Sequence, residues 1–392
     1  MIGTSARPVR VPSPVYRNAL LDSWVLSRYH DVDQGFRLEA FASADNLNHF
    51  FIGVDAETRS ELAPLERVVG SSTILQDGAE HTRRRSALMR GFKARDVDAL
   101  APQIQTAVDE LLTVMEQSTG EADLVRDFAE PLPRYVLCLL MGFPREDVSK
   151  VSHWCSDLLS FLGGPNPSRE LALRAQMSQL EQADYLQSQI DGRRRCPRDD
   201  LVSRLANANT GHSVLTDREI IGDLTQLAIA GNSTTTNLIA NGLWLLLTDP
   251  DQRDKLVSRP ELAAAATEEI LRYESPSQFM IRTAAEPVTL GGQVIQRGES
   301  VFLSIGAANR DPEVFSDPHR FDITRRLVRN LAFGAGPHFC SGARLARLEG
   351  AIALPALLQR FPQLRLRQRV PQWQPSIMMR AITTLPVDLG PT

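Results

Sequence analysis

The stretch Phe333-Gly-Ala-Gly-Pro-His-Phe-Cys-Ser-Gly342 (FGAGPHFCSG) decides the fold, because it places one cysteine at the end of a glycine-rich loop. The glycines let the backbone bring amide groups toward the Cys340 sulfur. A helix expected from about Ala343 to Leu358 adds partial positive charge at its N-terminus. Both effects favour the thiolate, the form of cysteine that binds metals or attacks as a nucleophile. A buried, inert cysteine is the ordinary alternative, and a nucleophilic role is disfavoured because no histidine–acid partner set is evident.

The composition describes a soluble globular protein. Hydrophobic residues make up 43% and charged residues 23% of the 392 residues, enough for a sizeable core. A formal net charge of −4 argues against nucleic acid as a main partner. The segment Met1–Pro12 lacks the apolar centre of a signal peptide, and no later stretch reaches the ~20 apolar residues of a membrane anchor.

The cysteines are widely spaced and show neither a disulfide framework nor a zinc pattern, so a reducing, cytoplasmic setting is expected. They are Cys138, Cys155, Cys196 and Cys340.

A long helix is predicted upstream of the cysteine loop. Thr216-Asp-Arg-Glu219 is a capping box that opens it, and Asp249-Pro250 ends it after Thr248. A helix of about 30 residues spans roughly 45–50 Å, so its middle should be buried. That middle nevertheless holds six consecutive polar residues, from Asn232 to Asn237.

The remaining pattern predicts a mainly helical protein with small β-sheets and a single domain, residues 1–392, because no linker or repeat is evident. The expected elements are a strand at Trp24–Arg28, a helix near Asp31–Leu38, mainly helices from Asp96 to about Arg194, a helix at Glu261–Glu274, strands between Val288 and Gly306, a long irregular stretch to Asn330, and short strands from Phe361 to Leu389.

The pattern Phe-x-x-Gly-x-His-x-Cys-x-Gly of the opening loop resembles the haem-binding loop of the cytochrome P450 family, the haem-thiolate monooxygenases. The resemblance implies the cytochrome P450 fold, with haem b (iron protoporphyrin IX) between the long helix and the helix after the loop. It makes Cys340 the metal ligand, whose thiolate donates electron density that helps break the O–O bond, and places Phe333 near the sulfur. Family members usually carry an extra helix before the first strand, which here is expected to be short or missing, because Pro14-Val-Tyr-Arg17 enters that strand almost at once.

Glu269-Ile-Leu-Arg272 places two opposite charges on neighbouring positions of one helix. Taken alone it is a common surface ion pair. The resemblance implies instead a buried structural network that Arg320 joins, from Pro318-His-Arg320-Phe321.

His81-Thr-Arg-Arg-Arg85 resembles the bacterial His-x-x-x-Arg element that binds the haem propionates, and Arg282 and His338 match two further propionate contacts. Arginine forks and histidine donors suit carboxylates. The alternative is a solvated basic helix face. The two arginines between His81 and Arg85 are expected to point outward, and a docking face for an acidic redox protein is expected from the basic cluster Arg83, Arg84, Arg344 and Arg347.

The polar run of the long helix matches the family's oxygen-side wall. Ala230 and Gly231 would give the cofactor clearance, and Thr234 would hydrogen bond to dioxygen at the haem or to a water beside it. The alternative is a Ser/Thr cluster that bonds back to i−4 carbonyls and bends the helix. Ser233 stands where the family usually has an acid and cannot ionise near pH 7. Protons would come through Asn232, Ser233, Thr234 and waters, or from the substrate's own hydroxyl or acid, or coupling is weak and reducing equivalents are lost as peroxide.

The substrate pocket is carried over by position only, and each residue could equally be ordinary core. Four of its members suggest a plastic apolar cavity, and two glutamines could orient a polar group. The pocket residues are Gln226, Ile229, Ala230, Gln278, Phe279, Met280, Met378 and Met379.

The resemblance implies a bacterial-type monooxygenase that hydroxylates or epoxidises an apolar small molecule such as a terpenoid, steroid, fatty acid or polyketide. Its partners would be O2 and an external ferredoxin or flavodoxin with its NAD(P)H-dependent reductase, since no flavin or iron–sulfur module is visible. A monomer is expected. Two alternatives stay open: an atypical member that performs oxidative cyclisation, coupling or peroxide-driven oxidation, and a non-catalytic haem-binding protein.

Overall fold

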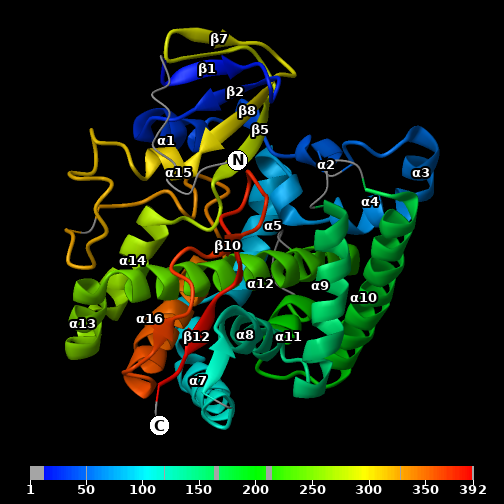
Figure 1. Ribbon diagram of the computed structural model, residues 1–392. Helices are drawn as coiled ribbons and strands as arrows, with labels where there is room; N and C mark the ends of the chain where they lie inside the picture. Colours follow the sequence, from blue (N-terminus) through cyan, green and yellow to red (C-terminus); the bar gives the residue numbers. More distant parts are fainter. Residues whose placement is uncertain are drawn as a thin grey trace. The chain divides into compact units, whose positions relative to one another are not determined.

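The computed structural model describes residues 13–49, 51–118, 120–162, 167–208, 214–326 and 328–390. They divide into two compact units: unit 1 comprises the described residues within 1–41, 100–133 and 233–392, and unit 2 comprises those within 42–99 and 134–232. Figure 1 labels the elements of both. The prediction of a single domain stays a prediction, and the expected loss of the N-terminal helix falls on residues 1–12, outside the described residues.

A five-stranded sheet in unit 1 has the order β1-β2-β8-β5-β3. Strands β2 and β8 pair in parallel, whereas β1–β2 and β5–β8 are antiparallel. Helix α1 covers this sheet (Figure 1), and Gly35 makes the close approach possible, because a Cβ there would lie 2.7 Å from Leu303 Cδ2. The strands are β1 (Val15–Asn18), β2 (Ser23–Leu26), β3 (Phe41–Ala42), β4 (Glu121–Asp123), β5 (Phe279–Ala284), β6 (Val288–Leu290), β7 (Gln293–Ile295), β8 (Ser300–Ser304), β9 (Arg365–Leu366), β10 (Gln372–Trp373), β11 (Ile382–Thr384) and β12 (Pro386–Asp388).

Glycines also set the helix packing in unit 1. A Cβ at Gly242 of α12 (Asp217–Thr248) would lie 2.9 Å from Ile270 of α14 (Ala263–Tyr273) and 3.1 Å from Leu354 of α16 (Ala343–Arg360). This packing fixes α16, and with it the cysteine loop that precedes α16. The helices of this unit are α1 (Tyr29–Arg37), α7 (Ala101–Glu116), η2 (Val125–Ala129), α13 (Pro250–Ser258), η4 (Pro260–Leu262), α14 (Ala263–Tyr273), α15 (Ile305–Ala308) and α16 (Ala343–Arg360).

Unit 2 is helical, with α9 and α10 side by side (Figure 1) around the buried Trp154 and Phe161. Residues of both units occur in α8 (Pro131–Met141) and α12 (Asp217–Thr248). The other elements are α2 (Asn46–His49), α3 (Ala56–Glu61), α4 (Ala63–Val69), η1 (Thr73–Leu75), α5 (Gly78–Gly91), α6 (Ala94–Asp98), η3 (Arg145–Asp147), α9 (Val148–Leu162), α10 (Arg169–Arg195) and α11 (Leu201–Ala206).

The predicted elements agree with the structure, which is mainly helical with small sheets. The capping box forms as predicted: the Thr216 backbone N–H donates to Glu219 Oε2 at 2.7 Å, and the Glu219 N–H donates to Thr216 Oγ1 at 3.3 Å. In the part of the chain that the structure describes, every helix is too short or too polar to cross a bilayer.

Candidate functional site

The Cys340 loop is held by its own backbone. Cys340 N–H donates to the carbonyl of Phe333 at 3.0 Å, which closes the loop three residues before α16 begins at Ala343. Gly334 and Gly336 have φ of +69° and +68°, a region that residues with a Cβ rarely adopt. A Cβ at Gly336 would also lie 2.6 Å from the carbonyl oxygen of Phe36 in α1. Glycine is therefore required here for the turn and for its contact with α1.

The residues present in unit 1 fit a haem. Cys340 is solvent-exposed, as is Cys196 at the end of α10, whereas Cys138 and Cys155 are buried. Burial raises the pKa of each of these two thiols to about 12, so they remain neutral. A Cβ at Gly342 would lie 4.0 Å from the Cys340 sulfur, which is an ordinary van der Waals distance, so position 342 does not crowd the sulfur. An accessible thiol after a glycine turn suits iron, and the guanidinium of Arg282 in the same unit suits a carboxylate.

Of the other predicted contacts in unit 1, Arg282 is buried in β5 with its guanidinium 5.9 Å from the ring centroid of Phe36. His338 and Phe333 are half-buried. The Phe333 ring lies edge-on to the exposed Phe339, with ring centroids 6.4 Å apart.

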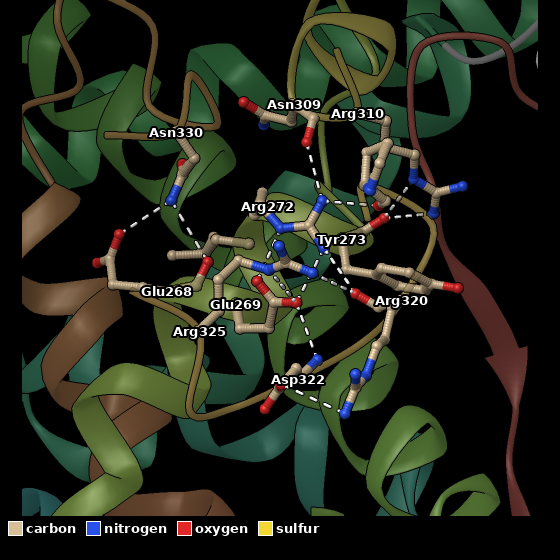
Figure 2. A network of polar contacts seen from close by, with 12 residues as sticks. Glu268, Glu269, Arg272, Tyr273, Asn309, Arg310, Arg320, Asp322, Arg325 and Asn330 are labelled. Carbon is tan, nitrogen blue, oxygen red and sulfur yellow. Dashed lines mark hydrogen bonds and ion pairs between the residues drawn. The ribbon is translucent and has the colours of Figure 1, made fainter. Parts of the chain in front are cut away.

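The Glu269–Arg272 pair is buried, as the resemblance implied. Arg272 donates two hydrogen bonds to Glu269, at 2.7 and 2.8 Å. Its other N–H groups donate to the carbonyls of Asn309, Pro318 and Arg320, so all five donors have partners. Figure 2 shows this network at the end of α14.

The prediction that the Arg320 side chain completes this network is wrong. That side chain is 65% exposed and lies 3.7 Å from Asp322, and only its backbone carbonyl reaches Arg272. Arg325, with its side chain 13% exposed, donates instead to Glu269 Oε1 at 3.2 Å (Figure 2). The physical reason is the path of the irregular segment, which turns carbonyl oxygens of residues 316–320 toward Arg272 and Arg325 and leaves the Arg320 side chain in solvent.

In unit 2, His81 is buried and Arg85 is half-buried, both on α5. The expectation that Arg83 and Arg84 point outward is wrong. Both pair with Glu80 and Glu219, and their side chains are 28% and 14% exposed. Glu219 stands at the buried start of α12 and attracts both cations. These arginines lower the pKa of Glu80 to about 2.

The polar run lies inside α12, as predicted. Thr235, Thr236 and Asn237 are buried, whereas Ser233 and Thr234 are half-buried. Asn232 is buried, and its Oδ1 atom has no hydrogen-bond partner within the described structure.

Ala230 and Gly231, the two residues directly before the polar run, are both small. Ala230 is half-buried. A Cβ at Gly231 would lie 2.8 Å from Leu137 of α8, so helix packing is one reason for this glycine. A role of Ala230 and Gly231 toward a cofactor stays a prediction.

The predicted pocket residues fall into two groups. In unit 1, Gln278 N–H donates to the Met378 carbonyl at 2.8 Å, and Ser277 bridges Met379, so the two segments are neighbours. Phe279 and Met280 follow in β5 and are half-buried. In unit 2, α12 carries a group of three: Gln226, Ile229 and Ala230.

Gln278 already has a structural role. Its Nε2 donates to the Ser275 carbonyl at 2.6 Å, and a Cβ at Gly306 would lie 2.3 Å from its Oε1. A contact of this amide with substrate stays a prediction.

Sequence reasoning missed residues that organise these segments. Asn309 is fully buried and its Oδ1 accepts from Leu331 N–H at 2.6 Å, which ties the end of α14 to the start of the cysteine loop. Asp223 in α12 accepts from the backbone N–H and the hydroxyl of Thr73, and burial raises its pKa to about 6. The sequence did contain a signal for Asp223. It stands one helical turn after Glu219 on a helix predicted to be buried, and two acidic residues so placed indicate polar partners elsewhere in the fold.

Comparisons with known proteins agree with this geometry. A sequence profile of the family described as Cytochrome P450 matches residues 174–386. The chain is 35% identical to the polyketide biosynthesis cytochrome P450 PksS of Bacillus subtilis (strain 168), over 97% of this chain and 94% of that protein. It is 37% identical to the vitamin D(3) 25-hydroxylase of Pseudonocardia autotrophica, over 98% and 92%.

Among solved structures, P450BioI in complex with an acyl carrier protein ligated to hexadec-9Z-enoic acid has a TM-score of 0.86 at 33% identity, covering 96% of this chain and 94% of that one. The likeness extends over nearly the whole length of each protein. The chain therefore belongs to the cytochrome P450 family, and it is a haem-thiolate monooxygenase with the cytochrome P450 fold whose cofactor is iron protoporphyrin IX (haem b).

Proposed function

We propose that this protein hydroxylates or epoxidises an apolar small molecule of the terpenoid, steroid, fatty acid or polyketide class. Its electrons come from NAD(P)H through an external ferredoxin or flavodoxin with its reductase, and it acts as a monomer in the cytoplasm. The observation that carries the proposal is the exposed Cys340 thiol at the end of a loop closed on Phe333 and packed on α1. The names of PksS, a polyketide biosynthesis cytochrome P450, and of the vitamin D(3) 25-hydroxylase support the polyketide and steroid classes.

The predicted haem contacts have defined tasks in this proposal. Cys340 holds the iron, and the haem when bound supplies the chemistry of oxygen activation and insertion. Arg282 and His338 donate to its carboxylates, as do His81 and Arg85. Buried Arg282 suits this task, because a guanidinium held in a strand presents its donors in a fixed direction.

Proton delivery is assigned to the polar run of α12. The Thr234 hydroxyl hydrogen bonds to dioxygen or to a water beside it, and Ser233 passes a proton through its hydroxyl. The unpartnered Oδ1 of Asn232 supports this assignment, because a buried acceptor is satisfied by an ordered water, and such a water extends the relay.

The test of the substrate class is a binding screen of the purified holoenzyme against a fatty acid, a steroid, a terpenoid and a macrolactone. Displacement of water from the iron shifts the Soret band, and no redox partner is needed. We expect saturable shifts with at least one class, and oxygenated product from that ligand when NADH and a ferredoxin pair are added. A shift without product from any electron source would favour a non-catalytic haem protein.

Ser233 favours a second candidate, an atypical oxidation such as ring closure, coupling or peroxide-driven chemistry, because serine is a poor substitute for an acid in proton delivery. Ser233→Asp distinguishes the two. If this enzyme is an ordinary hydroxylase limited by protons, the variant forms more product per NADH consumed. An unchanged ratio, with faster turnover on peroxide than on NADH, supports the second candidate.

A further inference from the structure

Arg347 stacks on the first residue of the cysteine loop. Its guanidinium carbon lies 4.4 Å from the ring centroid of Phe333. Arg347 comes from the second turn of α16, and Phe333 opens the loop that Cys340 closes. An arginine within about 6 Å of a ring centroid is attracted by the negative face of the ring. The contact therefore holds a positive charge beside the loop.

Glu268 keeps that charge in place. Arg347 Nε donates to Glu268 Oε1, and Nη2 lies 3.5 Å from Oε2. Glu268 also accepts from Asn330 Nδ2 at 2.9 Å (Figure 2). Asn330 Oδ1 in turn accepts from Ala332 N–H, directly before Phe333, at 3.0 Å. The carboxylate is thus held from the side of the loop as well as by Arg347.

The connection reaches Cys340 through one more bond. The carbonyl of Phe333, whose ring carries Arg347, accepts the N–H of Cys340 at 3.0 Å. A sequence of direct contacts therefore runs from Glu268 of α14 through Arg347 of α16 and Phe333 to Cys340. Its two charged members before Phe333, Glu268 and Arg347, have opposite sign.

We propose that the Glu268–Arg347 pair sets the reduction potential of the haem held by Cys340: Arg347 favours the reduced state, and Glu268 opposes it. Reduction adds one negative charge at the iron, so a nearby cation stabilises the reduced state and a nearby anion destabilises it. Groups around the metal ligands are the usual means of such tuning. Both residues are positioning residues, and the inference rests on Cys340 being the iron ligand proposed above.

The test is a spectroelectrochemical titration of the purified holoenzyme. Arg347→Gln should lower the ratio of reduced to oxidised haem at a fixed potential by about tenfold, or about 59 mV for one electron. Glu268→Gln should raise this ratio. Arg347→Lys keeps the charge without the planar stack, so its potential should stay close to wild type.

The matched control is Arg360→Gln on the same helix. Arg360 pairs with Glu116, and its side chain is 44% exposed, compared with 40% for Arg347. It stands near the far end of α16 from Cys340, so its removal should not change the potential.

Shifts of opposite sign in Arg347→Gln and Glu268→Gln support the proposal, because a merely structural loss would disturb the loop in the same way in both variants. Shifts of the same sign, no shift in Glu268→Gln, or an equal shift in Arg360→Gln overturn it. If Arg347→Gln fails to bind haem, the reduction potentials of Glu268→Gln and Arg347→Lys decide whether the proposal holds. The haem–thiolate absorbance of the carbon monoxide adduct is measured first. Its survival in Cys340→Ser would disprove the proposed ligand, which is a different failure.

Discussion

Glu269 in α14 and Glu349 in α16 are buried to nearly the same degree, with 4% and 1% of the residue exposed, but their surroundings are opposite. Glu269 accepts from two arginines and from the backbone N–H of Asp322. Glu349 has an Oε2 atom without any hydrogen-bond partner in the described structure, and burial raises its pKa well above the usual range. Burial alone therefore does not determine the charge of a carboxyl group; the donors around it do.

The largest effect is expected for Glu269→Gln. The substitution leaves the buried Arg272 and the half-buried Arg325 without their anion, and removing one partner of a buried pair costs about 3–5 kcal/mol. The urea midpoint of the holoenzyme should fall strongly, and haem retention with it, because the network holds the segment before the cysteine loop. A midpoint within error of wild type would mean that the network is not a stabilising element. Glu261→Gln, at an exposed glutamate of the preceding turn, is the control.

The second prediction separates the two arginines of the irregular segment. Arg325→Gln removes bonds to Glu269 and to the carbonyls of Ser316, Asp317 and Arg320, so we expect a loss of about 2 kcal/mol in unfolding free energy. Arg320→Gln should cost less than about 0.5 kcal/mol, because that side chain is exposed. Equal losses of unfolding free energy in the two variants, measured by urea titration, would show that the Arg320 side chain does contribute to the network.

Arg320 and Arg325 also show which parts of the site the sequence can predict and which it cannot. Motif spacing is sufficient to predict the glycine loop that ends at Cys340, the Glu269–Arg272 pair and the capped start of α12, because each depends on contacts between residues close in the chain. The choice between Arg320 and Arg325 depends on the path of a segment without regular structure, where no periodicity tells which side chain turns inward. The same limit applies to Arg83 and Arg84, which pair with Glu219, a residue far away in the sequence.

Asp223 is intermediate between Glu269 and Glu349 in this comparison: its carboxylate has hydrogen-bond donors, but they are the neutral groups of Thr73. Burial raises its pKa from 3.8 to about 6, so the stability that the bound proton contributes is complete below pH ~4 and is lost as the pH rises through 6. Asp223→Asn removes this loss. Its unfolding free energy relative to wild type should therefore improve by about 3 kcal/mol between pH 4 and 7.

The control for that titration is Thr73→Ser, which keeps both donors to Asp223 and should keep the wild-type pH profile. A constant difference between Asp223→Asn and wild type across this range would show that Asp223 is already ionised at pH 4. The measurement is the urea midpoint at half-unit intervals of pH.

The smallest effect near pH 5 is expected for Glu349→Gln, because glutamine resembles the neutral acid that burial favours. The sequence carries a signal here, since the neighbours of Glu349 at i±3 and i±4 are all apolar: Leu345, Ala346, Ile352 and Ala353. In the unfolded chain Glu349 ionises above its ordinary pKa, while in the fold it keeps its proton, so wild-type stability falls as the pH rises. The limiting slope is about 1.4 kcal/mol per pH unit. The variant lacks this slope, so its advantage in unfolding free energy should grow from pH 5 to pH 8. An advantage that shrinks with pH would require an ionised Glu349 with a cation beside it, and would remove the contrast with Glu269.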